Sequence, residues 1–414
     1  MTEQQAPHPS AGASEAPARL HYLDTLRVLA VATVFVFHAF RPFNVTDWLV
    51  MNDRTSPVAI AFEALVGPWG MPFFFLLSGA GTWFALRRRT LRQYVVERVN
   101  RLLVPYLLGC LLLTPIQGYF DWRFSSALEE RPLTFLQFML DRWGGLNPTV
   151  FDRLGYHLWF LAFLFCVSLV ALPVFLWLRR APGQRWVARL AELCQHRGGI
   201  FVFLLPLLII QMGLRPFAPQ SYGWSDFVYY LVFFIIGALF VCDERFARAV
   251  RRDWWLALIA GIAAFLGLGV LVALGVGEIW FADPSLPGFY LWWAVATLDT
   301  WPWIVVMWFV GMRYLDISNR WLRYGQETIV PFYVFHQPVI VAISFYVVQW
   351  QVGVTLKMLV IFFGSLAITL AIVELIRRIA PLRALFGMKV AGRPLTVQPQ
   401  EATPSSRPGT QPPA

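Results

Sequence analysis

Two ionisable side chains interrupt the first apolar stretch of the chain, "YLDTLRVLAVATVFVFH". Arg27 and His38 are eleven positions apart, which on an α-helix is three turns and about 16 Å, and both fall on nearly the same face. Arginine binds phosphate through a planar fork of donors, and a neutral imidazole acts as a general base near pH 7. The spacing predicts a site for an elongated molecule with an anionic head at Arg27 and a reactive tip at His38. Coenzyme A thioesters have that shape.

Both residues also have simpler interpretations. Arg27 can extend its charge to the membrane surface and pair with Asp24 three positions before it. His38 can bond to a neighbouring helix without taking part in chemistry. Their shared face favours the joint functional interpretation over either structural one.

A second polar group occurs in "YGQETIVPFYVFHQPVIV", residues 324–341. Glu327 and His336 are nine positions apart, which places them on opposite faces of an ideal helix, although Pro331 between them can kink it. We expect His336 to be a hydrogen-bonded site residue. Glu327 is a second candidate, or alternatively a solvated carboxylate at the membrane edge.

Further polar residues accompany these. Arg98 and Arg101 lie next to the third apolar stretch and can add to an anion site. His157 opens "HLWFLAFLF" and is expected at the outer membrane interface. Asp299 falls near the middle of an apolar stretch and needs a partner or a proton there. The sequence does not assign roles to His157 or Asp299.

The elements that position these residues are predicted by composition. The 414 residues are 58% hydrophobic and 14% charged, whereas soluble domains have about 25% charged residues. Apolar stretches long enough to cross a bilayer are predicted at 22–42, 65–86, 102–120, 156–178, 199–214, 226–242, 254–276, 289–312, 329–350 and 354–376. The expected fold is an all-α, polytopic membrane protein of about ten helices.

The distribution of basic residues predicts the orientation. The loops after even-numbered spans and both tails hold 25 lysines and arginines, the other loops hold 8, and Arg27 lies within the first span. Basic residues mark cytoplasmic loops, so both termini are expected in the cytoplasm, with the protein in the inner membrane. The first span lacks a basic leader and is expected to stay as an uncleaved anchor. Tails 1–18 and 394–414 are expected to be disordered, on either side of a membrane domain at 19–393.

The same distribution argues against a nucleic-acid partner, despite a net charge of +10. The arginines cluster in short loops between apolar spans, which is a topology signal rather than a polyanion-binding stripe. The four cysteines form no Cys-x-x-Cys pair, so no metal site or disulfide framework is predicted.

Five segments of the chain, taken in order, resemble the acyltransferase type 3 family of integral membrane acyltransferases. Arg27, ten residues and His38 resemble the signature of that family's first helix. "FFFLLSGAGTWFALRRR", "ERVNRLLVPYLLG", "HLWFLAFLF" and "ETIVPFYVFHQPVI" are similar to later family segments, over about residues 20–380. Within the family, the chain is most similar to a glucan-modifying branch that succinylates periplasmic glucans.

The resemblance implies transfer of an acyl group from cytoplasmic acyl-CoA, a substrate rather than a permanently bound cofactor, to a hydroxyl of a carbohydrate or lipid-linked acceptor at the outer face. Arg27 would hold coenzyme A phosphate, with Asp24 orienting it. His38 would serve as general base or carry the acyl group transiently. His336, Glu327, Arg98 and Arg101 are the further site candidates that the resemblance supports.

Two other classes of function remain open. A transporter or flippase for an anionic lipid or sugar would use the same intramembrane polar residues to line a path. A haem-binding protein would use His38, His157 and His336. For that second alternative the predicted spans place His38 and His336 at different depths.

Overall fold

A computed structural model describes residues 20–125, 133–143, 155–276 and 283–388. Within these ranges every regular element is a helix, and nine helical runs are long and apolar enough to cross a membrane. A bent pair, Tyr156–Val170 with Leu172–Leu178, forms a tenth. Each run overlaps one of the ten predicted stretches, although several begin earlier in the chain, and this confirms the all-α, polytopic fold class. The predicted disordered tails lie outside the described residues.

The first half of the bundle contains α1 (His21–Phe40), η1 (Arg41–Phe43), α2 (Pro57–Arg88), α3 (Leu91–Arg98), η2 (Val99–Leu103), α4 (Val104–Leu112), α5 (Thr114–Ser125), α6 (Phe135–Trp143), η4 (Tyr156–Leu158), α7 (Trp159–Val170), α8 (Leu172–Leu178) and α9 (Ala181–Leu193). The second half contains η5 (Gly199–Phe203), α10 (Leu204–Ile209), η6 (Ile210–Leu214), η7 (Arg215–Phe217), α11 (Trp224–Cys242), α12 (Glu244–Ala273), α14 (Pro287–Tyr314), α15 (Arg320–Val347), α16 (Val354–Arg378) and α17 (Ala380–Leu385).

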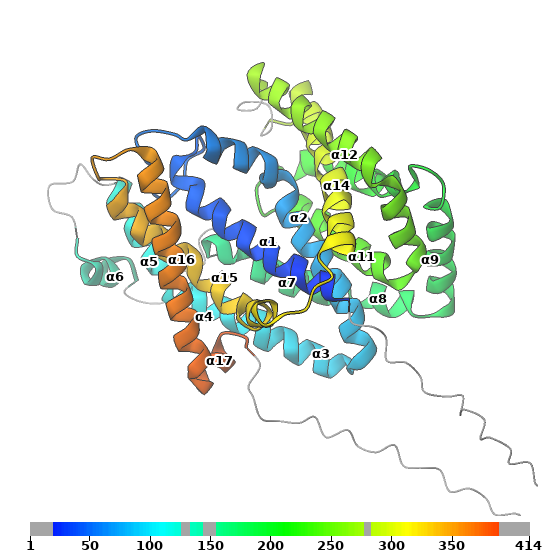
Figure 1. Ribbon diagram of the computed structural model, residues 1–414, viewed down its shortest axis with the longest axis horizontal. Helices are drawn as coiled ribbons and strands as arrows, with labels where there is room; N and C mark the ends of the chain where they lie inside the picture. Colours follow the sequence, from blue (N-terminus) through cyan, green and yellow to red (C-terminus); the bar gives the residue numbers. More distant parts are fainter. Residues whose placement is uncertain (1–19, 126–132, 144–154, 277–282, 389–414) are drawn as a thin grey trace, which may run out of the picture.

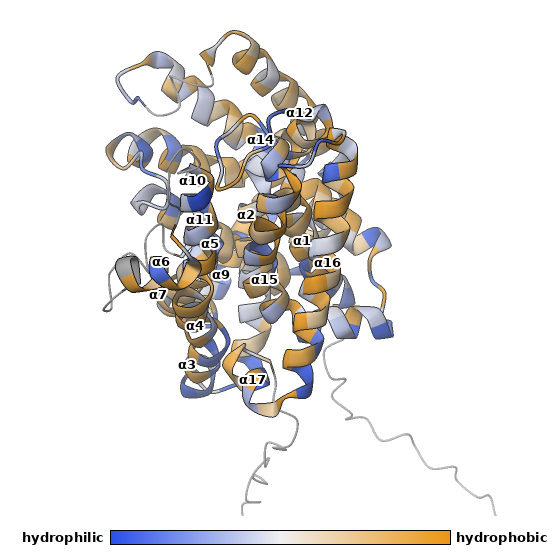
Figure 2. Ribbon diagram, turned by 90° about the vertical axis from the view of Figure 1, so that its left-hand side faces the viewer, coloured by the Kyte–Doolittle hydropathy of each residue, from blue (hydrophilic) through white to orange (hydrophobic). Residues whose placement is uncertain are grey.

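The spans alternate in direction, so α1 begins and α17 ends on the same side of the bundle, the lower side in Figure 1. We call this side the terminal face and the opposite side the far face. Hydrophobic residues cover the helices between the two faces, and hydrophilic residues gather mainly at their ends and in the loops (Figure 2). This is the distribution that a bilayer requires of a helical bundle.

Helix α1 packs against α2, α14, α15 and α16. Close packing of α2 against α11 depends on two glycines. A Cβ atom at Gly79 would overlap the carbonyl oxygen of Phe234, and one at Gly237 would overlap that of Leu76. Small residues of this kind let membrane helices approach to backbone contact. The pair fixes α2, which forms one wall of the cavities described below.

Candidate active site

Three histidines from three separate helical segments meet in the half of the bundle nearer the far face. His38 of α1 lies 3.0 Å from His336 of α15, measured from Nδ1 to Nε2. The His157 ring centroid is 5.0 Å from that of His336 and 6.3 Å from that of His38. His157 and His336 are buried. No group of three or more His, Cys, Asp or Glu residues in the described part of the chain is arranged to hold a metal ion.

The expectation that His38 and His336 lie at different depths is therefore wrong. Helix α15 begins at Arg320, well before the apolar stretch predicted from residue 329. Hydropathy did not predict these first turns, because they are polar although they are helical. Asn319 caps them by accepting a hydrogen bond from the Leu322 amide. Both α1 and α15 start at the terminal face, so His38 and His336, each well into its helix, come to the same height.

The hydrogen bonds determine the tautomers of a neutral pair. Nδ1 of His336 lies 2.6 Å from the carbonyl oxygen of Tyr333, which can only accept, so Nδ1 carries the proton. Nε2 of His336 is then an acceptor, and Nδ1–H of His38 donates to it. This leaves Nε2 of His38 with a free lone pair. An acceptor in the position of His336 can orient a histidine as a base, in the way that a carboxylate orients a catalytic histidine.

His157 is held from both sides by α15. Its Nε2 lies 3.1 Å from the Val334 carbonyl oxygen, and the Tyr333 hydroxyl donates to the His157 carbonyl oxygen. Its Nδ1 is buried and has no protein hydrogen-bond partner among the described residues. For the neutral ring this atom is an unused acceptor beside His38. The sequence signal for His157 was only its place at the start of an apolar stretch, so its position in the cluster was not predicted.

A cavity of about 470 Å³ adjoins the histidines. Its wall includes His38, His157, Tyr333 and aromatic and aliphatic residues of α1, α2 and α14. His336 does not line it. Of the hydrogen-bonded pair, His38 is therefore the member that faces the cavity, and His336 lies behind it.

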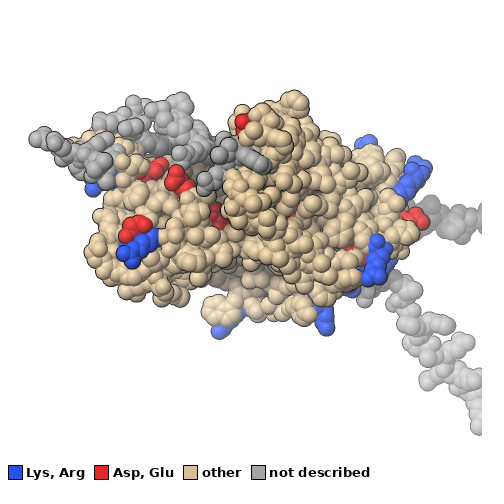
Figure 3. Space-filling view, turned by 90° about the horizontal axis from the view of Figure 1, so that it is seen from above, with Lys and Arg blue, Asp and Glu red and all other residues tan. Residues whose placement is uncertain are grey.

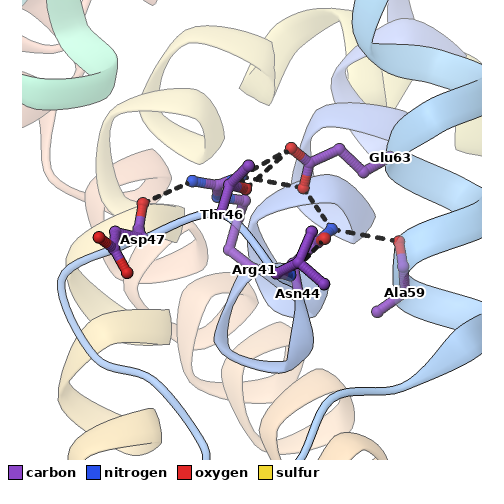
Figure 4. A network of polar contacts seen from close by, with 7 residues as sticks. Arg41, Asn44, Thr46, Asp47, Ala59 and Glu63 are labelled. Atoms are coloured by element: carbon purple, nitrogen blue, oxygen red, sulfur yellow. Dashed lines mark hydrogen bonds and ion pairs between the residues drawn. The ribbon is translucent and has the colours of Figure 1, made fainter. Parts of the chain in front are cut away.

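A polar network holds the loop that follows α1 (Figure 4). The Arg41 guanidinium donates to both carboxylate oxygens of Glu63 on α2, at 2.7 and 3.0 Å, and to the carbonyl oxygen of Asp47 at 2.9 Å. Asn44 also donates to Glu63. The loop in turn brings the Trp48 ring over His38, with centroids 6.4 Å apart. The network thus positions one wall of the histidine site.

Buried Lys357 at the start of α16 fixes the rest of this loop. Its ammonium group donates to Asn52 Oδ1 at 2.9 Å and to the Val348 carbonyl oxygen at 2.7 Å, and it lies 3.7 Å from Asp53. A buried ammonium group is costly unless all its donors are paired. These contacts join the loop after α1 to the end of α15.

Arg27 lies towards the terminal face, in a basic cavity of about 290 Å³ whose lining also includes Arg89, Arg98 and Arg101. Its guanidinium donates to Asp24 at 3.2 Å, a pairing expected in both interpretations of Arg27, and to the Leu77 carbonyl oxygen at 3.0 Å. A Cβ atom at Gly81 would overlap the guanidinium. The glycine therefore makes room for Arg27 against α2.

The structure groups Glu327 with the arginines and not with His336. Its carboxylate accepts from Arg383 at 3.0 Å, and it lines a second terminal-face cavity, of about 420 Å³, with Arg27 and Asp24. Glu327 thus lies in the part of α15 nearer the terminal face, and His336 lies close to the middle of the helix. No contact places Glu327 within reach of the histidines.

Their shared helix face predicted that Arg27 and His38 line one continuous groove, but they do not. They line two neighbouring cavities, whose walls share Phe74 and Tyr333. Tyr333 is thus the link between the basic region and the histidines. Asp299 lies apart from both cavities. It is buried in α14, where its Oδ1 accepts from the Trp303 indole at 3.0 Å.

Comparison with known proteins adds to this geometry. A family model described as "Acyltransferase domain" matches residues 20–374. The glucans biosynthesis protein C of Salmonella agona, of Salmonella dublin and of Salmonella enteritidis PT4 are each 24% identical over 388 residues, covering 91% of this chain and 97% of the relative. No solved structure shows a significant match. The chain therefore belongs to the acyltransferase type 3 family of integral membrane acyltransferases, and it is an O-acyltransferase.

Proposed function

We propose that this enzyme takes an acyl group from acyl-CoA bound at the terminal face and transfers it to a hydroxyl of a glucan at the far face. The observation that carries the proposal is the His38–His336 hydrogen bond, which presents an unprotonated nitrogen to a cavity that shares Phe74 and Tyr333 with the wall of the basic cavity. The names of the relatives, glucans biosynthesis protein C, support a glucan as acceptor. The excess of basic loops on the terminal side supports a cytoplasmic position for that face.

The basic cavity suits the donor. Coenzyme A carries phosphates, and Arg27, Arg89, Arg98 and Arg101 outnumber the one carboxylate, Glu97, that lines the same space. Arginine forks bind phosphate oxygens through paired, charge-assisted hydrogen bonds. With its phosphates there, the pantetheine arm would extend past Phe74 and Tyr333 and bring the thioester to the histidines.

The proposed chemistry is a single acyl transfer. Nε2 of His38 accepts the proton of the acceptor hydroxyl as its oxygen bonds to the thioester carbon. The carbon–sulfur bond then breaks, and coenzyme A leaves as a thiol after taking that proton from the His38 imidazolium. His336 accepts from Nδ1–H of His38 throughout and so stabilises the charged ring. The products are an acyl ester and free coenzyme A.

The test is coenzyme A release by purified protein with a panel of acyl-CoAs and neutral glucan oligosaccharides. Glucan-dependent release with an ester on the glucan supports the proposal. If glucan causes no release with any of the donors, the proposal is wrong. The transporter alternative predicts movement of an anionic lipid or sugar across vesicles without acyl-CoA consumption, so the same preparation distinguishes the two.

A further inference from the structure

A second cavity opens at the far face beside the histidine site. It has a volume of about 540 Å³ and lies between α2, η6, η7, α11 and α14. Gly67, Met71, Trp159 and Tyr222 line both this cavity and the one that contains His38. A molecule bound here would therefore lie beside the cavity that contains the proposed base.

The lining combines aromatic rings with polar side chains. The rings are those of Trp159, Tyr222, Tyr229, Tyr230, Trp292 and Trp293. Arg215, Gln211, Asp226, Ser221 and Thr297 add donors and acceptors. A sugar ring has the complementary surface, because its C–H faces pack on aromatic rings while its hydroxyls need both donors and acceptors around its edge.

The charges of this cavity favour a neutral ligand. Arg215 and Asp226 are the two charged residues that line it among those described, and they form an ion pair with each other. Arg215 also donates to Gln211 and stacks on Trp293, with its guanidinium carbon 3.8 Å from the ring centroid. The positive charge is thus already compensated. The basic cavity near Arg27 is different, because its arginines exceed its carboxylates.

Tyr222, whose side chain lines both cavities, has a strained backbone conformation. Tyr222 has a φ of 62°, in the left-handed region that side chains other than glycine rarely adopt. Its backbone amide donates to Asp226 Oδ2 at 2.7 Å, and its ring lies 4.7 Å from that of Trp159. Strained residues of this kind persist where neighbouring contacts hold them, often at binding sites. Asp226 thus links the buried ion pair to the placement of an exposed aromatic ring.

The space-filling view from above looks onto the far face (Figure 3). Blue and red side chains on the described surface there form separate spots and no continuous basic area. The described part of this face therefore offers no basic area that would attract an anionic acceptor, and for a neutral acceptor stacking and hydrogen bonding inside the cavity would provide the affinity.

From these observations we infer that the cavity lined by Tyr222, Trp292 and the Arg215–Asp226 pair is the acceptor subsite, and that it binds a neutral saccharide. The inference rests on the proposed function and adds to it the place and the chemistry of acceptor recognition. Tyr222 and Trp292 are the specificity residues, because their rings line the cavity without belonging to the buried ion pair.

The experiment uses the full-length protein in detergent with a neutral, linear glucose oligosaccharide as probe. Its binding is measured directly, and its KM is measured at saturating acyl-CoA. Tyr222→Ala and Trp292→Ala should each weaken binding and raise this KM by about tenfold, the size expected when an anchoring aromatic ring is lost. Acyl-CoA affinity should stay unchanged. Trp292→Phe, which keeps a ring, should recover most of the loss.

The matched control is Trp224→Ala. Trp224 is an exposed aromatic residue at the start of α11 on the same face, and it does not line the cavity. It should leave the KM unchanged. If the wild type transfers acyl groups to the oligosaccharide and both cavity variants keep its KM, the inference is overturned while the proposed function stands. If the wild type binds the oligosaccharide through Tyr222 and Trp292 without transferring, the subsite stands and the proposed reaction is wrong. Displacement of the bound oligosaccharide by lipid headgroups but not by other neutral sugars also overturns the inference.

Discussion

Nδ1 of His38 and Nε2 of His336 are 3.0 Å apart, although the two residues are separated by 298 positions in the chain. Because His336 gives its own Nδ1–H to a backbone carbonyl group, this contact fixes which nitrogen of His38 is free. The rest of the site surrounds that nitrogen, with a basic cavity towards the terminal face and an aromatic cavity at the far face.

We predict that His336 positions His38 and does not itself react. His336→Leu should lower kcat by about 10²-fold, because His38 loses its acceptor and its preferred tautomer. His336→Gln should recover part of the activity, since an amide oxygen can still accept from Nδ1–H. The KM for acyl-CoA should not move in either variant. Equal loss in both variants, with equal loss of thermal stability, would indicate a purely structural residue.

Arg27 should determine donor affinity. Arg27→Ala should weaken acyl-CoA binding by about tenfold or more, and Arg27→Lys should recover only part of it, because lysine keeps the charge but loses the fork. Gly81→Ala should resemble Arg27→Ala, because the added methyl group displaces the guanidinium. Gly269→Ala is the control, since a Cβ atom there meets nothing within 4 Å. Unchanged affinity in Arg27→Ala would contradict the assignment of the donor site.

Lys357 should stabilise the loop that covers His38. Lys357→Met removes a buried ammonium group and leaves Asn52 Oδ1 and the Val348 carbonyl oxygen without it, a cost of about 1–3 kcal/mol. The melting temperature in detergent should fall, while Gln351→Met at an exposed position of the same face should leave it unchanged. An equal melting temperature in both variants would mean that these hydrogen bonds contribute no net stability.

The orientation in the membrane is also testable. Single cysteines are placed at Ser10 and Thr55 after the four native cysteines have been replaced. An impermeant thiol reagent should label Thr55→Cys in intact cells, and Ser10→Cys only after the cells are opened. The reverse result would place the basic cavity outside and would remove the argument for a cytoplasmic donor.

Hydropathy was sufficient to predict the ten spans, because a bilayer requires long apolar helices whatever the details of the packing. Arg27 and His38 were identified for the same reason, since charged and titratable groups stand out within such stretches. The relation between His38 and His336 was not predictable, because it depends on where α15 starts. Its first turns, from Arg320, are polar, so no hydropathy signal marks them.

His157 and the far-face cavity show a different limit of prediction from the sequence. His157 lies outside the middle of its span, where a histidine carries little signal. The pairing of Arg215 with Asp226 joins η7 to the start of α11 and faces α14, and aromatic residues are common at membrane interfaces for reasons unrelated to binding. These residues can be recognised as parts of one site only when the packing of separate helices places them in one cavity.

The most direct test is acyl transfer by well-folded His38→Gln protein, measured as ester formed on the glucan acceptor under conditions of saturating acyl-CoA. Glutamine keeps a hydrogen-bonding group near His336 but cannot accept the hydroxyl proton as a base. The transfer rate should fall by about 10²–10⁴-fold, the usual loss when a general base is removed, with acyl-CoA affinity unchanged. Transfer near the wild-type rate would show that His38 is structural and would contradict the proposed mechanism.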